Sequence, residues 1–275
     1  MLIGIVGLGL MGGSFGLSLK QSMEDVQLLG FDHNEEHCKM AYSLSLVDEI
    51  VSMSEIKKCD VIILAIPVVA ILKTIKELED VSNKTTIIDL GSTKEEIVLK
   101  TPQSLKSNFI AAHPMAGTEN FGPTAAFSDL YRGKIVVLCD TDKNDPFHKN
   151  RAISIFEALK MQIVYMNSKE HDLHAAYISH LPHALSYALA NSVLKQEEPK
   201  SILALAAGGF RDMSRIAKSS PNMWTDIFRQ NKTNLLYSIE SFEKELSYAK
   251  SLIENDDYDK LREWMQSATT LHKIL

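Results

Sequence analysis

Short apolar runs alternate with longer amphipathic stretches in the first part of the chain. Several of these runs are almost wholly apolar, as is typical of parallel strands that are buried on both faces of a sheet. Helical patterns separate most of them, which indicates βαβ units and a doubly wound sheet. The predicted strands are Leu2–Val6, Gln27–Phe31, Val61–Ile66, Thr85–Leu90, Phe109–Ala112, Ile135–Cys139 and Gln162–Tyr165.

The strand pattern stops at about Ser168, and the rest of the chain places apolar residues at helical spacing. The predicted helices are 168–195, 198–207, 221–251 and 256–273. We therefore expect an α/β domain over residues 1–167, followed by an all-helical domain over residues 168–275. No Gly/Ser-rich linker separates the two halves, so we expect them to pack together, with no further regulatory domain.

Composition and charge exclude several classes of protein. The 275 residues are 45% hydrophobic and 23% charged, as in ordinary globular chains. A net charge of -6 without a basic block makes a nucleic-acid or anionic-membrane partner unexpected. Three dispersed cysteines fit a reducing compartment rather than a disulfide framework or a structural zinc site. The longest apolar run, Val61–Leu72, contains Pro67 and is too short to span a bilayer, so we expect a soluble, cytoplasmic protein.

The first predicted strand runs into a glycine loop. Gly7, Gly9 and Gly12 form the pattern G-x-G-x-x-G between a strand and a helical pattern that starts near Met11. The first glycine permits a tight turn, the second lets the backbone approach a pyrophosphate, and the third allows close packing of helix and strand. This context predicts a Rossmann-type dinucleotide-binding domain, whereas a purely structural glycine turn is the alternative.

An acidic residue stands at the end of the second predicted strand. Asp32 follows Gly12 by 20 residues, where a carboxylate can accept the ribose hydroxyls of NAD and would repel the 2′-phosphate of NADP. The backbone of Ala65 to Pro67, at another strand end, could edge the nicotinamide, although Pro67 also suits a helix start. The predicted cofactor-binding residues are Gly7, Leu8, Gly9, Met11, Gly12, Asp32, Ala65 and Pro67.

Two further strand ends carry candidate catalytic groups. Ser92 or Thr93 could cap the next helix in a capping box with a following glutamate, or a hydroxyl there could bond a substrate. His113 follows an apolar strand and precedes Pro114, which holds it in an extended conformation. A histidine held beside a nicotinamide is suited to act as a general base, because its ordinary pKa lies near neutrality.

The helical half is rich in histidine and carries an arginine cluster. His180 and His183 share one helical face, roughly opposite that of His171 and His174, so the four histidines do not predict a metal site. Asp212 and Arg215 could form an ion pair along one helix. Alternatively, the Arg215 guanidinium could bind a substrate carboxylate in bidentate fashion.

Six motifs together resemble the prephenate dehydrogenase family. They are the glycine loop, GSTK from Gly91, HPMAG from His113, ISHLPH from Ile178, GGFRDMSR from Gly208 and SSPNMW from Ser219. They follow the order and approximate spacing of that family and extend over nearly the whole chain. Ser214 departs from the threonine expected there, but it keeps the hydroxyl group.

The resemblance implies an NAD-dependent enzyme of tyrosine biosynthesis whose helical domain forms a homodimer. By this similarity His113 accepts the C4 hydroxyl proton of prephenate while NAD+ takes the hydride, and loss of CO2 gives 4-hydroxyphenylpyruvate without a metal. Ser92 resembles the serine that helps to hold the hydroxyl and the histidine. The implied substrate-binding residues are His180, His183, Asp212, Arg215 and Trp224, with Trp224 expected to enter from the partner subunit.

Several alternatives stay open at this point. Prephenate and arogenate differ by a keto group and an amine, and no single residue chooses between them, so an arogenate or cyclohexadienyl dehydrogenase is equally compatible. A β-hydroxyacid dehydrogenase also joins a Rossmann domain to helices, but it resembles a lysine-centred catalytic helix that is absent here. A non-catalytic NAD sensor would leave the proton-accepting histidine and the carboxylate-binding arginine without a purpose.

Overall fold

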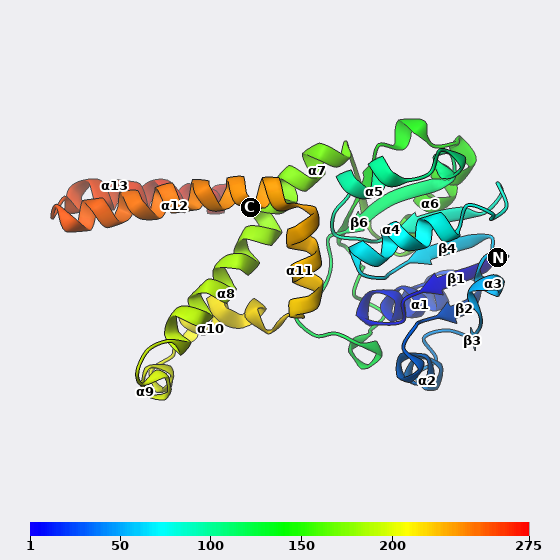
Figure 1. The fold of residues 1–275 in the computed structure, drawn as a ribbon, viewed down its shortest axis with the longest axis horizontal. Coiled ribbons are helices and arrows are strands. Elements are labelled where there is room, and N and C mark those ends of the chain that lie inside the picture. Colours follow the sequence, from blue (N-terminus) through cyan, green and yellow to red (C-terminus); the bar gives the residue numbers. More distant parts are fainter. Residues whose placement is uncertain (275) are drawn as a thin grey trace. The chain divides into compact units, whose positions relative to one another are not determined.

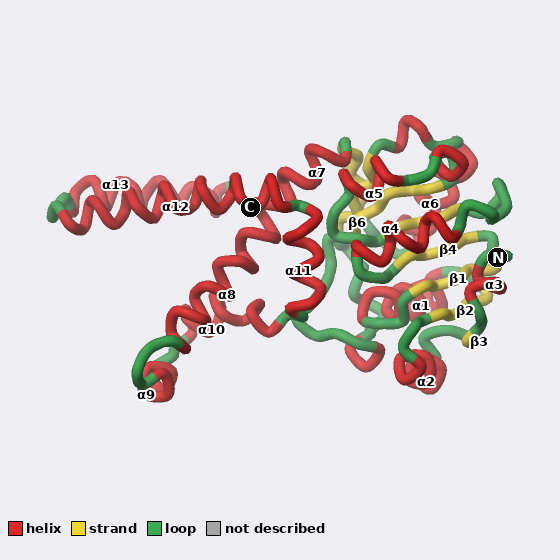
Figure 2. Tube along the Cα trace, viewed as in Figure 1, coloured by secondary structure: helices red, strands yellow, loops and turns green. Residues whose placement is uncertain are grey.

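The computed structural model describes residues 1–274, and its first half is built on one sheet (Figures 1 and 2). In the described residues the sheet has eight strands in the order β3-β2-β1-β4-β5-β6-β7-β8. The strands are β1 Leu2–Val6, β2 Gln27–Phe31, β3 Glu49–Ile50, β4 Val61–Leu64, β5 Thr86–Asp89, β6 Phe109–Pro114, β7 Ile135–Cys139 and β8 Gln162–Met166. The Rossmann-type α/β expectation is therefore confirmed.

The pairing of the strands fixes where their ends meet. β1 pairs in parallel with β2 and β4, and β4, β5 and β6 continue the parallel order. The carboxyl ends of these strands therefore share one edge of the sheet, which is where ligands bind in such folds. β7 runs antiparallel to β6 and parallel to β8, a reversal that the apolar runs alone did not indicate.

Both faces of the sheet are covered by helices, in three layers (Figure 1). In β4, Val61 and Ile63 join the core on one face, whereas Ile62 and Leu64 join the core on the other. This alternation explains the wholly apolar runs, because successive side chains of a strand point to opposite faces. Helices α1 Leu10–Ser22, α2 Glu35–Ser43 and α6 Pro146–Ala158 contribute to the first core, and α3 Met53–Ile56, α4 Val68–Glu77, α5 Glu95–Lys100 and α11 Pro221–Gln230 to the second.

The second half is helical, as expected. A π-helical turn at Ala176–His180 connects α7 and α8, directly before Pro182 in the first turn of α8. Proline lacks the N–H that would continue regular α-helical bonding, and π turns are frequent at functional sites. The helices are α7 Ser168–Ala175, α8 Leu181–Leu194, α9 Pro199–Ala204, α10 Gly208–Ser214, α11, α12 Lys232–Glu254 and α13 Tyr258–Thr269.

Two helical predictions differ from the structure. The helix predicted over 221–251 is two helices, because α11 ends at Gln230 and α12 starts at Lys232. Asn231 between them is buried, and its side-chain amide donates to the Asp172 carbonyl oxygen at 2.6 Å. The helix α10 is absent from the predicted helices, because its two leading glycines have low helix propensity.

The chain forms two compact units, Met1–Asn231 and Lys232–Leu275. In the first, α5 contacts α7 and α11 contacts α4, so residues 168–231 pack against the sheet domain. In the second, α12 and α13 pack against each other, and Trp264 Nε1 donates to Glu245 Oε2 at 2.9 Å. Among the described residues, no helix is long and apolar enough to cross a membrane.

Candidate active site

Two glycines of the loop between β1 and α1 are required by the packing of the chain itself. Gly7 has a φ of +93°, and a Cβ atom there would lie 2.4 Å from the Ala65 carbonyl oxygen. A Cβ atom on Gly12 would lie 1.9 Å from the Gly7 carbonyl oxygen. Any side chain at either position would therefore displace the turn or push α1 away from the sheet.

Gly9 has a different explanation. A Cβ atom on Gly9 would meet no other atom within 4 Å, so the packing of the chain does not require glycine there. Gly9 is also the N-cap of the 13-residue helix α1, and no side chain caps this helix. Exposed N–H groups at a helix N-terminus attract an anion. A pyrophosphate that lies against the backbone would account for both features, and the loop therefore fits a dinucleotide.

Asp32 is held in place by the same loop. Its Oδ2 accepts the Leu8 N–H at 2.8 Å, and its Oδ1 accepts the Asn34 N–H at 2.8 Å. Each carboxylate oxygen keeps further lone-pair capacity, which can accept a ribose hydroxyl. A contact between Asp32 and the ribose stays a prediction.

The other predicted cofactor residues lie around the loop. The Met11 carbonyl oxygen accepts the Tyr131 hydroxyl at 2.8 Å. Ala65 follows β4, and its methyl group would be 3.1 Å from a Cβ atom on Gly12. Pro67 is the N-cap of α4, which agrees with the helix-start interpretation. A contact between Ala65 or Pro67 and nicotinamide stays a prediction.

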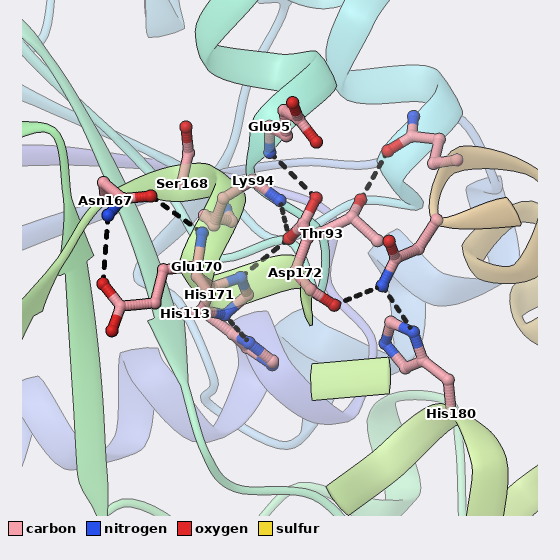
Figure 3. Close-up of polar contacts among 12 residues, drawn as sticks. Thr93, Lys94, Glu95, His113, Asn167, Ser168, Glu170, His171, Asp172 and His180 are labelled. Carbon is pink, nitrogen blue, oxygen red and sulfur yellow. Dashed lines mark hydrogen bonds and ion pairs between the residues drawn. The ribbon is translucent and has the colours of Figure 1, made fainter. Parts of the chain in front are cut away.

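His113 lies near the carboxyl end of β6, at the same sheet edge as the glycine loop. Its side chain is buried, and its Nδ1 lies 2.8 Å from His171 Nε2 (Figure 3). No hydrogen bond within residues 1–274 occupies its Nε2, and the residue keeps 9% exposure. The ring is therefore fixed through one nitrogen, while the other nitrogen is free to meet a ligand.

Asp172 connects α7 to the start of α5. Its Oδ1 accepts the Lys94 N–H at 2.7 Å, and its Oδ2 accepts the Glu95 N–H at 2.9 Å (Figure 3). Asp172 Oδ1 also lies 2.8 Å from His171 Nδ1. The capping-box interpretation of Ser92 or Thr93 is wrong, because the distant Asp172 carboxylate binds the N–H groups that a local cap would take.

A buried ion pair lies behind His113. Lys94 and Asp89 are both fully buried, and Lys94 Nζ donates to Asp89 Oδ2 and to the Ala112 carbonyl oxygen. The Gly91 N–H donates to Asp89 Oδ1 at 2.7 Å. Lys94 thereby binds the Ala112 carbonyl oxygen of β6, and its positive charge, paired with Asp89, lies near His113. The sequence pattern did not predict this pair, although Asp89 at the end of a buried strand and Lys94 five residues later were visible as candidates.

Burial and charge both act on the pKa of His113. Burial lowers this pKa well below its ordinary value, and the nearby His171, Lys94 and His180 lower it further. The imidazole is therefore neutral at neutral pH. A neutral imidazole has one nitrogen lone pair that can accept a proton.

His180, His183 and Trp224 form a second cluster beside this one. The Trp224 ring is stacked on His183, with centroids 3.5 Å apart, and lies 6.0 Å from the His180 ring. The Asn231 amide lies 3.0 Å from His180 Nδ1, and burial lowers the pKa of His180 to about 4. With Nδ1 as the acceptor of a neutral ring, His180 Nε2 carries the hydrogen.

Two N–H donors of this cluster are buried without a partner. His180 Nε2 and Trp224 Nε1 make no hydrogen bond among the described residues. Unpaired buried donors are rare in folded proteins and often mark a position for a ligand or an ordered water. Trp224 is only 6% exposed within its own chain, and its entry into the site of a partner subunit stays a prediction.

Arg215 is exposed and lies in the short 3-10 helix that follows α10. Its Nη1 donates to Glu119 Oε2 at 3.0 Å, and Glu119 belongs to the loop after β6. The ion pair between Asp212 and Arg215, which was the alternative to a substrate-binding role, is therefore not formed. Asp212 is exposed and has no ion pair among residues 1–274. The pairing brings Arg215 to the loop that follows His113, which helical spacing could not reveal.

Ser92 is half-buried, and its hydroxyl makes no hydrogen bond in the described part of the chain. The neighbouring Thr93 Oγ1 instead donates to Gln230 Oε1. A contact of Ser92 with substrate stays a prediction.

The structure brings His113 together with His171, Asp172 and Lys94, none of which had been assigned to the reaction from the sequence.

Comparison with known proteins assigns this arrangement to a family. The sequence profile described as the nucleotide-binding domain of prephenate dehydrogenase matches residues 15–165. The profile described as the dimerization domain of prephenate dehydrogenase matches residues 167–267. The chain belongs to the prephenate dehydrogenase family. The resemblance inferred from the six motifs is thereby confirmed.

Individual members of the prephenate dehydrogenase family match nearly the whole chain. Prephenate dehydrogenase of Bacillus subtilis is 31% identical over 96% of this chain and 73% of its own length. The structure of A. aeolicus prephenate dehydrogenase with hydroxyphenyl propionate and NAD+ has a TM-score of 0.93 and 34% identity, covering 99% of this chain and 97% of the other. Synechocystis arogenate dehydrogenase has a TM-score of 0.81 and 30% identity, covering 99% of both chains.

Proposed function

We propose that this protein catalyses the NAD-dependent oxidative decarboxylation of prephenate to 4-hydroxyphenylpyruvate, a step of tyrosine biosynthesis. The observation that carries the proposal is the placement of His113. Its free Nε2 lies at the sheet edge that also carries the open glycine loop. A proton acceptor and a dinucleotide loop at one edge suit the oxidation of an alcohol. Membership of the prephenate dehydrogenase family supplies the substrate class.

Each group of the site has a part in this reaction. NAD+, when bound at the glycine loop, supplies the oxidising power. His113 Nε2 accepts the proton of the C4 hydroxyl, and Ser92 helps to orient that hydroxyl. Departure of the ring carboxylate as CO2 makes the ring aromatic, which provides the driving force.

The carboxylates of the substrate need cationic or N–H partners. Arg215 can provide a bidentate guanidinium once it exchanges Glu119 for the substrate, with Asp212 close by in sequence. The unpaired His180 Nε2 and Trp224 Nε1 can donate to carboxylate oxygens, and His183 fixes the Trp224 ring by stacking. In this proposal the substrate site extends from His113 to the cluster of His180, His183 and Trp224.

The test is the formation of NADH, followed at 340 nm, by purified protein with NAD+ and either prephenate or arogenate. We expect turnover with prephenate. Turnover of arogenate alone would replace the substrate while preserving the reaction, and the similarity to Synechocystis arogenate dehydrogenase makes this the second candidate. Binding of NAD+ without turnover of either substrate would contradict the proposal.

The cofactor preference follows from Asp32. Replacing Asp32 by alanine is expected to raise kcat/KM with NADP relative to NAD, because it removes a charge that repels the 2′-phosphate. Asp32 also holds the Leu8 N–H, so Asp32→Asn is the matched control. It removes the charge but keeps an acceptor. If both variants kept the NADP-to-NAD ratio of the parent enzyme, the preference would not depend on this carboxylate.

The division of labour along the chain is also part of the proposal. Residues 1–167 bind the dinucleotide, and residues 168–275 complete the substrate site and form a homodimer. The two matched profiles, which meet between residues 165 and 167, support this division. We place the enzyme in the cytoplasm, because its three cysteines are free thiols, as is usual in a reducing compartment.

A further inference from the structure

Two histidines and one aspartate form a continuous chain behind the proposed base. Asp172 Oδ1 lies 2.8 Å from His171 Nδ1, and His171 Nε2 lies 2.8 Å from His113 Nδ1 (Figure 3). His171 is 3% exposed and Asp172 is 2% exposed. Both ring nitrogens of His171 are thus engaged within the protein, so neither can bind a ligand.

The partners of Asp172 determine the direction of these hydrogen bonds. Its carboxylate accepts the backbone N–H groups of Lys94 and Glu95, as an ionised acceptor does at a helix start. Towards His171 it must also accept, so a neutral His171 carries its hydrogen on Nδ1 and offers a lone pair on Nε2. His113 must then donate from Nδ1. Its Nε2, at the open side of the site, is left with the lone pair.

We propose that His171 is a positioning residue which, with Asp172 as its acceptor, holds His113 in the tautomer that can act as a base. The same chain disperses positive charge once His113 Nε2 has taken a proton. The Nδ1 hydrogen of His113 is then shared with His171 Nε2, and the Nδ1 hydrogen of His171 is shared with Asp172. One proton enters, none leaves, and the negative charge of Asp172 offsets the positive charge that forms.

The other surroundings of His113 disfavour a positive charge on its ring, so the hydrogen-bonded chain to Asp172 is needed to offset that charge. Lys94 contacts the backbone of β6 at Ala112, and its charge is paired with Asp89. His180 lies on the π-helical turn and is neutral. Burial of the ring disfavours an imidazolium at His113, and the positive charge of Lys94 disfavours it further. Asp89 is already paired with Lys94, so Asp172 is the carboxylate that can act on His113, and it does so only through His171.

The test compares two variants of His171. His171→Leu removes the acceptor for His113 Nδ1 and is expected to lower kcat by about 10²-fold, within the range of roughly 10² to 10⁴ for loss of general-base catalysis. His171→Gln keeps an amide oxygen that can accept and an amide N–H that can donate, so it should recover most of this loss. KM and NAD+ affinity should stay close to those of the parent. His174→Leu, an exposed position on the same helix, is the control for α7.

A second measurement is independent of turnover. The ¹⁵N spectrum of histidine-labelled protein, assigned by difference from His113→Asn, should show His113 with a protonated Nδ1 and an unprotonated Nε2. His171→Leu should make this signature a mixture of tautomers. Equal losses of kcat in His171→Leu and His171→Gln, or a protonated Nε2 in the parent protein, would overturn the inference. The kinetic arm depends on the proposed function, whereas the spectrum decides the inference even if neither substrate turns over.

Discussion

Replacing His113 by asparagine is expected to lower kcat by about two to four orders of magnitude, the usual contribution of one general base. Asparagine retains a side-chain donor for His171 Nε2, but it has no lone-pair nitrogen that can take the substrate proton. In the proposed function NAD+ binds at the glycine loop, which this change leaves intact. The affinity for NAD+, measured by fluorescence titration, should therefore change little while turnover is lost.

The pH dependence of the parent enzyme provides a second readout of the same residue. Burial holds the pKa of His113 below its ordinary value, so the base is unprotonated at neutral pH. Turnover should fall only when the pH drops through this lowered pKa, on the acidic side of the ordinary value of about 6.5. His113→Asn should lose this acid limb together with its rate. A variant that kept the parent kcat would remove His113 from the mechanism.

Replacing Lys94 by methionine is expected to lower the free energy of unfolding by about 3–5 kcal/mol. The change leaves the fully buried Asp89 carboxylate with the Gly91 N–H as its remaining partner, and it also removes the hydrogen bond to the Ala112 carbonyl oxygen. Burial raises the pKa of Asp89, an effect that Lys94 opposes, so the carboxyl should take up a proton more readily in the variant. Chemical denaturation at neutral pH measures the effect.

Two controls separate the buried pair from ordinary surface charge. The double variant Lys94→Met with Asp89→Asn removes both charges and keeps an acceptor for the Gly91 N–H, so it should be more stable than Lys94→Met alone. Lys100→Met breaks an exposed pair with Glu96 and should change stability by less than about 1 kcal/mol. Equal effects of Lys94→Met and Lys100→Met would show that burial of the pair does not matter.

Most of the fold could be predicted because its signals are local. The bounds of β1, β2 and β7 match the predicted strands residue for residue, since apolar runs between helical patterns mark buried strands. β3 was missed because two residues leave no readable pattern. The break at Asn231 was missed because the helical periodicity continues through it, while its cause is a contact with Asp172.

The site was predictable only in part. The glycine loop and Asp32 carry a local signature, and His113 was visible as a polar residue at the end of an apolar strand. The alternative role of Arg215, an ion pair with Asp212 along one helix, is not formed, because the structure pairs Arg215 with Glu119 at a separation of 96 residues. Trp224 stacks on His183 within this chain, a contact that the sequence did not predict. In each case the true partner comes from another element, which side-chain spacing within one helix cannot identify.

The sequence by itself determined the alternation of strands and helices, the sheet edge that carries the glycine loop, and the family. Each of these depends on periodicity or on motifs within a few residues. The tertiary structure decided which groups act on His113. Docking of α7 against the end of the sheet joins His113 to His171 across 58 residues, and Lys94 to Asp172 across 78 residues. A hydrogen bond requires two atoms to approach within about 3 Å at a suitable angle, and only the packing of distant elements sets that geometry.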